Sequence, residues 1–223
     1  LYRSAQPMAR RIVARLDVVT AVSPVAASVV DRLAPVRLVP NGIDVGAYEP
    51  SSGVPRRVAF LGRDDPRKGL DVLLAAWPQV FAAIPTAELV VAAGARSEEM
   101  AGVRFVTVPE GDKRAYLQDA AIYCAPNLGG ESFGIVLVEG MAAGCAVVAS
   151  ALPAFAHVLG GTGVLTKPGD VDGLAGALIR VLGDDALCHD LQQRAIDRVA
   201  IFDRAAVLDG YVAAYRAAMS RAG

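Results

Sequence analysis

One stretch near the middle of the chain constrains the fold most, because a glycine-rich turn there joins a strand pattern to a helix pattern. Residues 121–125 form an apolar run that ends at Pro126, which predicts a buried strand. Residues 135–143 are apolar apart from Glu139, and Gly144 follows as a helix stop, so this segment predicts a short buried helix. The turn between them contains three glycines, at which the backbone can approach a ligand closely. The N-terminus of the helix then lies beside the turn, an arrangement that suits a phosphate.

Two carboxylates belong to this stretch. Glu131 lies in the turn, and Glu139 lies eight residues further on, inside the predicted helix. About two helical turns separate them if the helix starts early, so they can contact different parts of one extended ligand. They are too far apart along the chain to be assumed an acid–base pair. The alternative is that Glu139 is a core residue paired with a cation, because an unpaired buried carboxylate is costly.

The composition is that of a globular chain with enough apolar material for a large core. Of the 223 residues 54% are hydrophobic, and the net charge of −1 argues against nucleic acid as a general partner. Residues 140–166 carry no charge, but glycines and a proline interrupt them, so buried strands with turns are expected rather than a membrane span. Cys124, Cys145 and Cys188 form no CxxC pair and are expected to be reduced core thiols of a cytosolic protein.

Strands and helices alternate along the rest of the chain. Strands are predicted at residues 17–22, 36–39, 57–61, 87–93, 103–108, 121–125, 146–150 and 163–166. Helices are predicted at residues 1–16, 24–33, 70–81, 112–120, 135–143, 171–182, 185–199 and 204–219, with a short one that begins at Pro153. This rhythm predicts an α/β fold, a Rossmann-like parallel sheet covered by helices on both faces. Ligands of such sheets bind at the carboxyl ends of the strands.

A second glycine-rich turn, residues 62–69, also follows a predicted strand. It carries Arg63 just after the strand end, and Lys68 is expected to open the next helix beside Gly69. Two cations and a helix N-terminus suit a diphosphate leaving group, because fixed cations stabilise the charge that develops on it. The alternative is a solvated charged turn, in which an aspartate of the turn caps the helix and pairs with Arg67.

The histidines and the spacing of potential metal ligands indicate neither a catalytic histidine nor a metal site. His157 and His189 are the only two histidines, and both are expected to be structural. No cluster of histidine, cysteine and carboxylate has metal-ligand spacing, so no metal site is predicted.

The central stretch resembles a known enzyme family. Residues 125–139 read APNLGGESFGIVLVE, in which Glu131 and Glu139 match the E-x7-E motif of family 4 retaining glycosyltransferases, enzymes with the GT-B fold. The sequence of this segment is most similar to that of the mycobacterial-type phosphatidylinositol mannosyltransferases. The resemblance implies the C-terminal, donor-binding half of an enzyme that transfers mannose from GDP-mannose to a phosphatidylinositol-type lipid. Such an enzyme is expected to be cytoplasmic and peripheral on the cytoplasmic face of the plasma membrane.

The resemblance also implies roles for individual residues. Arg63 and Lys68 would hold the donor diphosphate, Glu131 the sugar hydroxyls and Glu139 the ribose hydroxyls. The other implied donor contacts are Gly62, the base-binding loop with Val108 and Lys113, and the backbone at Ser132, Phe133, Gly134 and Ile135. The loop of Val108 and Lys113, taken from its residues alone, is equally well an ordinary strand-to-helix connection. No cofactor, metal or protein nucleophile is expected, since retention in this family is usually explained by front-face attack with the leaving phosphate as base.

The same resemblance implies a domain organisation. Residues 40–45, PNGIDV, resemble the hinge of GT-B enzymes. Residues 1–44 would then be the tail of a largely missing N-terminal, acceptor-side domain, 45–203 the nucleotide-sugar-binding domain, and 204–223 a closing helix that returns toward the N-terminal domain. The absence of an initiator methionine fits a part of a longer protein.

Two other functions remain open at this point. One is a family 4 transferase that uses another nucleotide sugar or another acceptor. The other is a GT-B-like module that binds a nucleotide without transferring a sugar. Sugar transfer by the full-length protein separates the module from the enzymes, and a comparison of GDP with UDP separates the donors.

Overall fold

The computed structural model describes residues 6–51, 53–94 and 96–220. Its strands are β1 (Val19–Ala21), β2 (Val36–Leu38), β3 (Val54–Leu61), β4 (Glu88–Ala92), β5 (Val103–Phe105), β6 (Ala120–Ala125), β7 (Ala146–Ser150) and β8 (Val164–Thr166). Its α-helices are α1 (Gln6–Val13), α2 (Pro24–Ala27), α3 (Leu70–Ala83), α4 (Lys113–Gln118), α5 (Ile135–Ala142), α6 (Pro153–Leu159), α7 (Val171–Gly183), α8 (Asp185–Val199) and α9 (Arg204–Met219). Short 3₁₀ helices are η1 (Val45–Ala47), η2 (Pro66–Lys68), η3 (Glu110–Asp112) and η4 (Ala200–Phe202).

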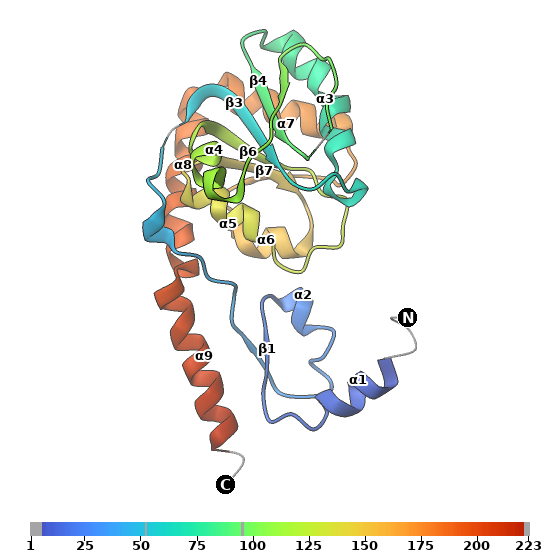
Figure 1. Cartoon of the computed structure of the whole chain (residues 1–223), viewed down its shortest axis with the longest axis vertical. Helices are drawn as coiled ribbons and strands as arrows, with labels where there is room; N and C mark the ends of the chain where they lie inside the picture. The colour runs from blue at the N-terminus through green and yellow to red at the C-terminus, as the bar shows by residue number, and fades with distance from the viewer. Residues whose placement is uncertain (1–5, 52, 95, 221–223) are drawn as a thin grey trace.

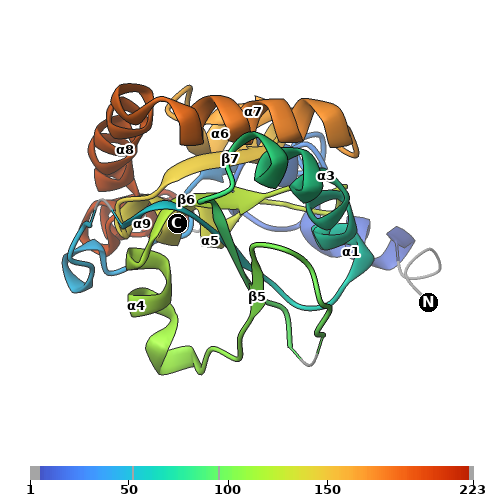
Figure 2. The same cartoon turned by 90° about the horizontal axis from the view of Figure 1, so that it is seen from above.

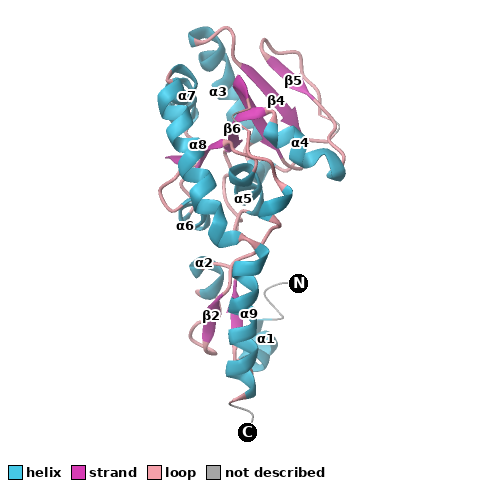
Figure 3. Ribbon diagram, turned by 90° about the vertical axis from the view of Figure 1, so that its left-hand side faces the viewer, coloured by secondary structure: helices cyan, strands magenta, loops and turns pink. Residues whose placement is uncertain are grey.

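These elements form a main unit, from β3 to η4, and a small unit, from α1 to β2, with α9 running alongside the small unit (Figure 1). The small unit contains the parallel pair β1–β2, and α9 contacts β1 (Figure 3). The chain crosses between the units twice, and the two crossings touch. Ile43 donates its backbone N–H to Phe202 at 3.0 Å and accepts from Arg204 at 2.8 Å. The two crossings therefore form one connection between the units.

The main unit is built on a parallel sheet of six strands in the order β5-β4-β3-β6-β7-β8. From β3 the chain moves outward through β4 to β5, then returns to place β6 against the other side of β3. The direction of strand order therefore reverses between β3 and β6. In an open parallel sheet this reversal leaves a crevice at the carboxyl ends of the two strands. The loops that follow them are the β3 loop, residues 62–69, and the β6 loop, residues 126–134.

Helices cover both faces of this sheet, as the sequence predicted. On β3, Val58 and Phe60 belong to one core while Ala59 belongs to the other, and Ile122 and Tyr123 divide in the same way on β6. This alternation is the two-residue period of a strand buried on both faces. Helices α3 and α7 pack together on one face, and α4 lies on the opposite face (Figure 2). The predicted α/β fold class is confirmed.

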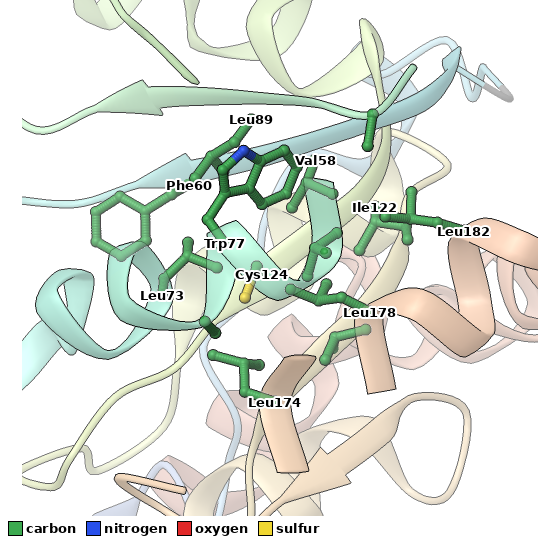
Figure 4. Packing of buried hydrophobic residues seen from close by; sticks show 14 of the residues in the cluster. Val58, Phe60, Leu73, Trp77, Leu89, Ile122, Cys124, Leu174, Leu178 and Leu182 are labelled. Atoms are coloured by element: carbon green, nitrogen blue, oxygen red, sulfur yellow. The ribbon is translucent and has the colours of Figure 1, made fainter. Parts of the chain in front are cut away.

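Trp77 of α3 is the largest side chain of the core beneath α3 and α7 (Figure 4). Its ring is fully buried, and its indole N–H donates to the carbonyl of Ala101 at 3.0 Å. A buried indole N–H needs such a partner, because leaving it without one would cost about 1–3 kcal/mol. The core therefore holds α3 firmly, and with it the end of the β3 loop.

The main differences from the sequence predictions lie in the small unit. The helix predicted over residues 24–33 ends at Ala27 and continues as turns. Val29 and Val30 come next after the C-cap Ser28, and β-branched residues favour a helix less than straight-chain residues do. Of the helix predicted over residues 1–16, the first five residues lie outside the described part.

The uncharged stretch 140–166 forms the end of α5, then β7, α6 and β8, as expected. Among the described helices, none combines the length and the apolar character needed to cross a membrane. Cys124 and Cys145 are buried free thiols, whereas Cys188 is only half-buried and so is not the core residue that was expected.

Candidate functional site

The β3 loop and the β6 loop are fastened to each other at the strand-order reversal. The backbone N–H of Leu128 donates to the carbonyl of Arg67 at 2.8 Å. Gly69 has a φ of +73° and lies so close that a Cβ on it would meet the carbonyl oxygen of Pro126 at 1.9 Å. Only glycine fits such a close approach. The glycine at this position therefore lets the two loops touch and fixes the backbone beside Lys68.

Lys68 and Glu131, one from each loop, form an ion pair. Lys68 Nζ lies 2.5 Å from Glu131 Oε1, and Asn127 Nδ2 donates to the same oxygen at 2.7 Å. The side chains of Lys68 and Glu131 are 28% and 18% exposed. The structure thus brings together two residues predicted to hold neighbouring parts of one ligand. Asn127 was missed as a site residue, although its position directly after a buried strand marked it as a polar side chain at the end of the sheet.

The solvated-turn alternative for residues 62–69 describes part of this loop. Asp65 accepts from the backbone N–H of Arg67 at 2.9 Å and pairs with its guanidinium at 2.7 Å. Hydrogen bonding to Arg67 lowers the pKa of Asp65 to about 2. Lys68, however, turns away from this pair toward Glu131. It also ends η2 rather than opening α3, which begins one residue after Gly69.

Lys113 and Glu139 form a second ion pair, which supplies the partner that the sequence did not identify. Lys113 Nζ lies 2.8 Å from Glu139 Oε1, and Glu139 is only 9% exposed. The other carboxylate oxygen, Oε2, is buried and has no hydrogen-bond partner in the described part of the chain. The pKa of the Tyr48 phenol is raised to about 12, mainly by burial and secondly by the negative charge of Glu139. A buried acceptor without a partner costs about 1–3 kcal/mol, so this oxygen is suited to a ligand hydroxyl.

Two adjoining hollows contain most of the predicted site. The larger has a volume of about 350 Å³ and is lined by Gly62, Arg63, Lys68, Val108 and Lys113, among others. The smaller, of about 70 Å³, is lined by Lys68, Asn127, Glu131, Gly134 and Ile135, among others. Leu61, Lys68 and Val136 line both, so Lys68 stands where the two meet. The larger volume lies within the range of small-molecule sites.

Helix α5 begins at the wall of the smaller hollow. Gly134, with a φ of +102°, precedes its first residue, and a Cβ there would meet the Phe155 ring at 2.8 Å. The first backbone N–H groups of a helix have no partner within it and attract anions. The Phe133 ring instead packs edge-on against Phe202, at 5.7 Å between ring centres, so only the backbone at this position is suited to a ligand. Among the predicted site residues, Ser132, Phe133 and Glu139 line neither of the two hollows.

Within the residues that the structure describes, no three histidine, cysteine or carboxylate side chains are arranged to hold a metal ion. The charged groups of the two hollows are instead three cations, Arg63, Lys68 and Lys113, and the carboxylates of Glu110 and Glu131. This set can bind a ligand that combines a diphosphate with several hydroxyl groups.

Residues 55–184 match the family model described as glycosyl transferases group 1, so the chain belongs to this family. It is 48% identical over 183 residues to the phosphatidyl-myo-inositol mannosyltransferase of Mycolicibacterium smegmatis, covering 74% of this chain and 47% of the relative. It is 40% identical over 195 residues to the mannosyltransferase of the same name from Mycobacterium leprae, covering 79% of this chain and 52% of the relative. The chain thus spans about half the length of these curated relatives. The predicted family is confirmed.

Solved structures show the same fold. Sucrose-phosphate synthase from Thermosynechococcus elongatus superposes with a TM-score of 0.82 at 26% identity, covering 98% of this chain and 62% of that one. The C-terminal domain of a group 1 glycosyl transferase from Francisella tularensis gives a TM-score of 0.63 at 19% identity, covering 71% of this chain and 97% of that one. The main unit is therefore the C-terminal half of a GT-B fold. The predicted domain boundaries and the roles of the site residues stay predictions.

Proposed function

We propose that this chain is the donor-binding half of a retaining mannosyltransferase that uses GDP-mannose and a phosphatidyl-myo-inositol lipid. The observation that carries the proposal is the arrangement at the strand-order reversal. There Lys68 meets Glu131 beside a cleft lined by Arg63 and Lys113, and Glu139 keeps one buried oxygen without a partner among the described residues. The identity of 48% to a phosphatidyl-myo-inositol mannosyltransferase supports mannose as the transferred sugar and the lipid as the acceptor.

The donor diphosphate is proposed to lie in the larger hollow. Arg63 and Lys68 line it and can contact phosphate oxygens, and the N-terminus of α5 adds backbone N–H groups at its edge. As the bond between the sugar and the diphosphate breaks, negative charge grows on the leaving oxygen. Cations that are already in place stabilise this charge without reorganising. In this proposal they meet the charge of the diphosphate without a metal ion.

The two carboxylates are proposed to hold hydroxyl groups on either side of the diphosphate. Glu131 lines the smaller hollow and would accept hydrogen bonds from the mannose. Glu139 would accept one from the ribose at Oε2, while Lys113 keeps Oε1. Lys113 and Val108 also line the larger hollow, and the purine is proposed to lie beside them.

The reaction itself needs little covalent chemistry from these residues. The acceptor hydroxyl attacks the anomeric carbon on the face from which the diphosphate leaves, and a phosphate oxygen takes the hydroxyl proton. Attack on this face retains the configuration of the anomeric carbon. The chain binds and orients the donor, and the acceptor is proposed to bind to the remainder of the enzyme, at the cytoplasmic face of the membrane.

Ligand-induced stabilisation tests the donor. At 100 times its dissociation constant, a ligand adds about 2.7 kcal/mol to the free energy of unfolding. GDP and GDP-mannose should raise the melting temperature of this chain more than UDP, ADP or their sugars at equal concentration. Equal or larger shifts with UDP would move the donor to a UDP-sugar. Transfer of labelled mannose from GDP-mannose to phosphatidylinositol vesicles by the full-length enzyme then tests the acceptor, and binding without any transfer would indicate a nucleotide-binding module.

A further inference from the structure

A single buried hydroxyl connects the small unit to the β6 loop. Ser23 Oγ donates to the carbonyl oxygen of Ser132 at 2.5 Å, although the two residues are 109 positions apart. Ser23 is fully buried, and the same hydroxyl accepts from the backbone N–H of Ala26 at 3.2 Å, which caps α2. A serine hydroxyl has only one proton to donate. Here that proton is committed to Ser132, while the capping of α2 uses a lone pair.

The bond to Ser132 sets the direction of the next backbone N–H. A peptide unit is planar and trans, so its carbonyl and its N–H point in opposite directions. With the carbonyl of Ser132 turned toward Ser23, the N–H of Phe133 points away from α2. Glu131 precedes Ser132 in the chain, and Phe133 is followed by Gly134, the residue before the first residue of α5.

The β6 loop needs such a restraint because its own residues supply little. Gly129, Gly130 and Gly134 all have φ between +75° and +159°, a region in which glycine is free and other residues are not. Between Gly130 and Gly134, Lys68 and Asn127 hold the Glu131 side chain, Phe202 packs against the Phe133 ring, and the Ser23 hydroxyl binds the carbonyl of Ser132. The contacts of Glu131 and Phe133 anchor side chains, whereas the bond from Ser23 fixes the orientation of a peptide.

We propose that Ser23 is a positioning residue for sugar transfer. It orients the peptide between Ser132 and Phe133 and thereby holds Glu131 and the start of α5 in register with the donor. The kinetic part of this inference rests on the proposed function, whereas the effect on the loop does not. Glu139 lies further along α5 and Lys113 lies on α4, both away from this peptide, so nucleotide binding should depend less on Ser23 than sugar transfer does.

Three variants separate this role from helix capping. Ser23→Gly removes the hydroxyl at little cost to the N-cap, because glycine is itself accepted at that position. Ser23→Ala removes it without the added backbone freedom of glycine. Ser23→Thr keeps the hydroxyl in the extended backbone found here, with φ −158° and ψ 164°. Ser28→Ala is the matched control, because its hydroxyl donates locally to Val25 at 2.8 Å, next to α2 but away from the loop.

The experiment measures amide hydrogen exchange across residues 129–137, GDP affinity, and the kcat and KM of mannose transfer in the full-length enzyme. Ser23→Gly and Ser23→Ala should speed exchange in this segment about tenfold and lower kcat about tenfold, the scale for one lost hydrogen bond at a positioned group. GDP affinity should fall by less than kcat does, and Ser23→Thr and Ser28→Ala should behave like the wild type.

Wild-type exchange and kcat in both Ser23→Gly and Ser23→Ala would overturn the inference. It would also fall if Ser28→Ala produced the same changes, since the effect would then come from α2 as a whole. If the wild-type enzyme transfers no mannose, the proposed function fails. The exchange rates of the glycine and alanine variants then still decide whether Ser23 orders the loop.

Discussion

Replacing each carboxylate of the site with its amide should separate their two roles. Glu139→Gln keeps the shape of the side chain and an oxygen for Lys113, but it removes the charge. The amide NH₂ in place of Oε2 cannot accept a hydrogen bond from a ribose hydroxyl. Because Oε2 already has no partner in the described residues, the amide loses no hydrogen bond at this atom, whereas the loss of charge beside Lys113 should lower the melting temperature. Any further effect at Oε2 should fall on ligand binding.

The size of that effect follows from burial and charge. Glu139 is 9% exposed, so water competes little with a bound hydroxyl for hydrogen bonding to its carboxylate. A hydrogen bond to a charged acceptor contributes about 1.5–3 kcal/mol, which is roughly a 10- to 150-fold change in the dissociation constant. GDP and GDP-mannose should lose this affinity equally, since both contain the ribose. Glu131→Gln should leave GDP affinity nearly unchanged and lower the rate of transfer, since its proposed partner is the mannose.

Titration calorimetry with GDP and GDP-mannose on the wild type and both variants measures these differences. Melting temperatures without ligand serve as the control for folding. If Glu131→Gln weakened GDP more than Glu139→Gln did, the two roles would have been assigned in reverse. If neither variant changed GDP affinity, Oε2 of Glu139 would not be part of the nucleotide site.

Four further predictions concern the two loops and one thiol. Lys68→Ala should slow transfer in the full-length enzyme about 100- to 1000-fold, the scale for removing a group that stabilises transition-state charge. Arg63→Ala breaks no ion pair among the described residues. It should weaken donor binding and leave the free energy of unfolding, measured in urea titrations, within about 0.5 kcal/mol of the wild type. Gly69→Ala should destabilise the chain by more than about 1 kcal/mol, and by more than the control Gly94→Ala, because Gly94 has a similar φ of +70° but a Cβ on it would meet nothing within 4 Å. Cys188, in which burial raises the thiol pKa to about 11, should react slowly with a thiol reagent at pH 7.5, and rapid labelling of the native chain would contradict the burial.

The sequence predicted the elements of the main unit well, for a physical reason. Its strands are apolar runs bounded by glycine, proline or charge, and predicted strand 146–150 and predicted helices 185–199 and 204–219 match β7, α8 and α9 residue for residue. The small unit was predicted less well, because its short helix α2 has no buried face that would mark its end by periodicity.

The ion pairs of the site were beyond sequence reasoning. Lys68 and Glu131 are 63 residues apart, and they meet only because β6 returns to pair with β3. No local pattern carries that information, and the same holds for the bond between Ser23 and Ser132, which are 109 positions apart. The charge types of the site could be predicted, but the partner of each charge depends on the order of strands in the sheet.

That order also explains why the two ion pairs suit different parts of the proposed donor. The Lys68–Glu131 pair is the more exposed of the two, at 28% and 18% against 19% and 12% for Lys113–Glu139. Partly exposed pairs contribute little, about 0–1 kcal/mol, so a diphosphate can draw Lys68 away and leave Glu131 for the sugar at small cost. The more buried pair costs more to break, because removing a partner strands a charge in the interior. Under the proposed function, the pair that exchanges partners therefore faces the bond that breaks, and the pair that stays intact holds the ribose, which the reaction leaves unchanged.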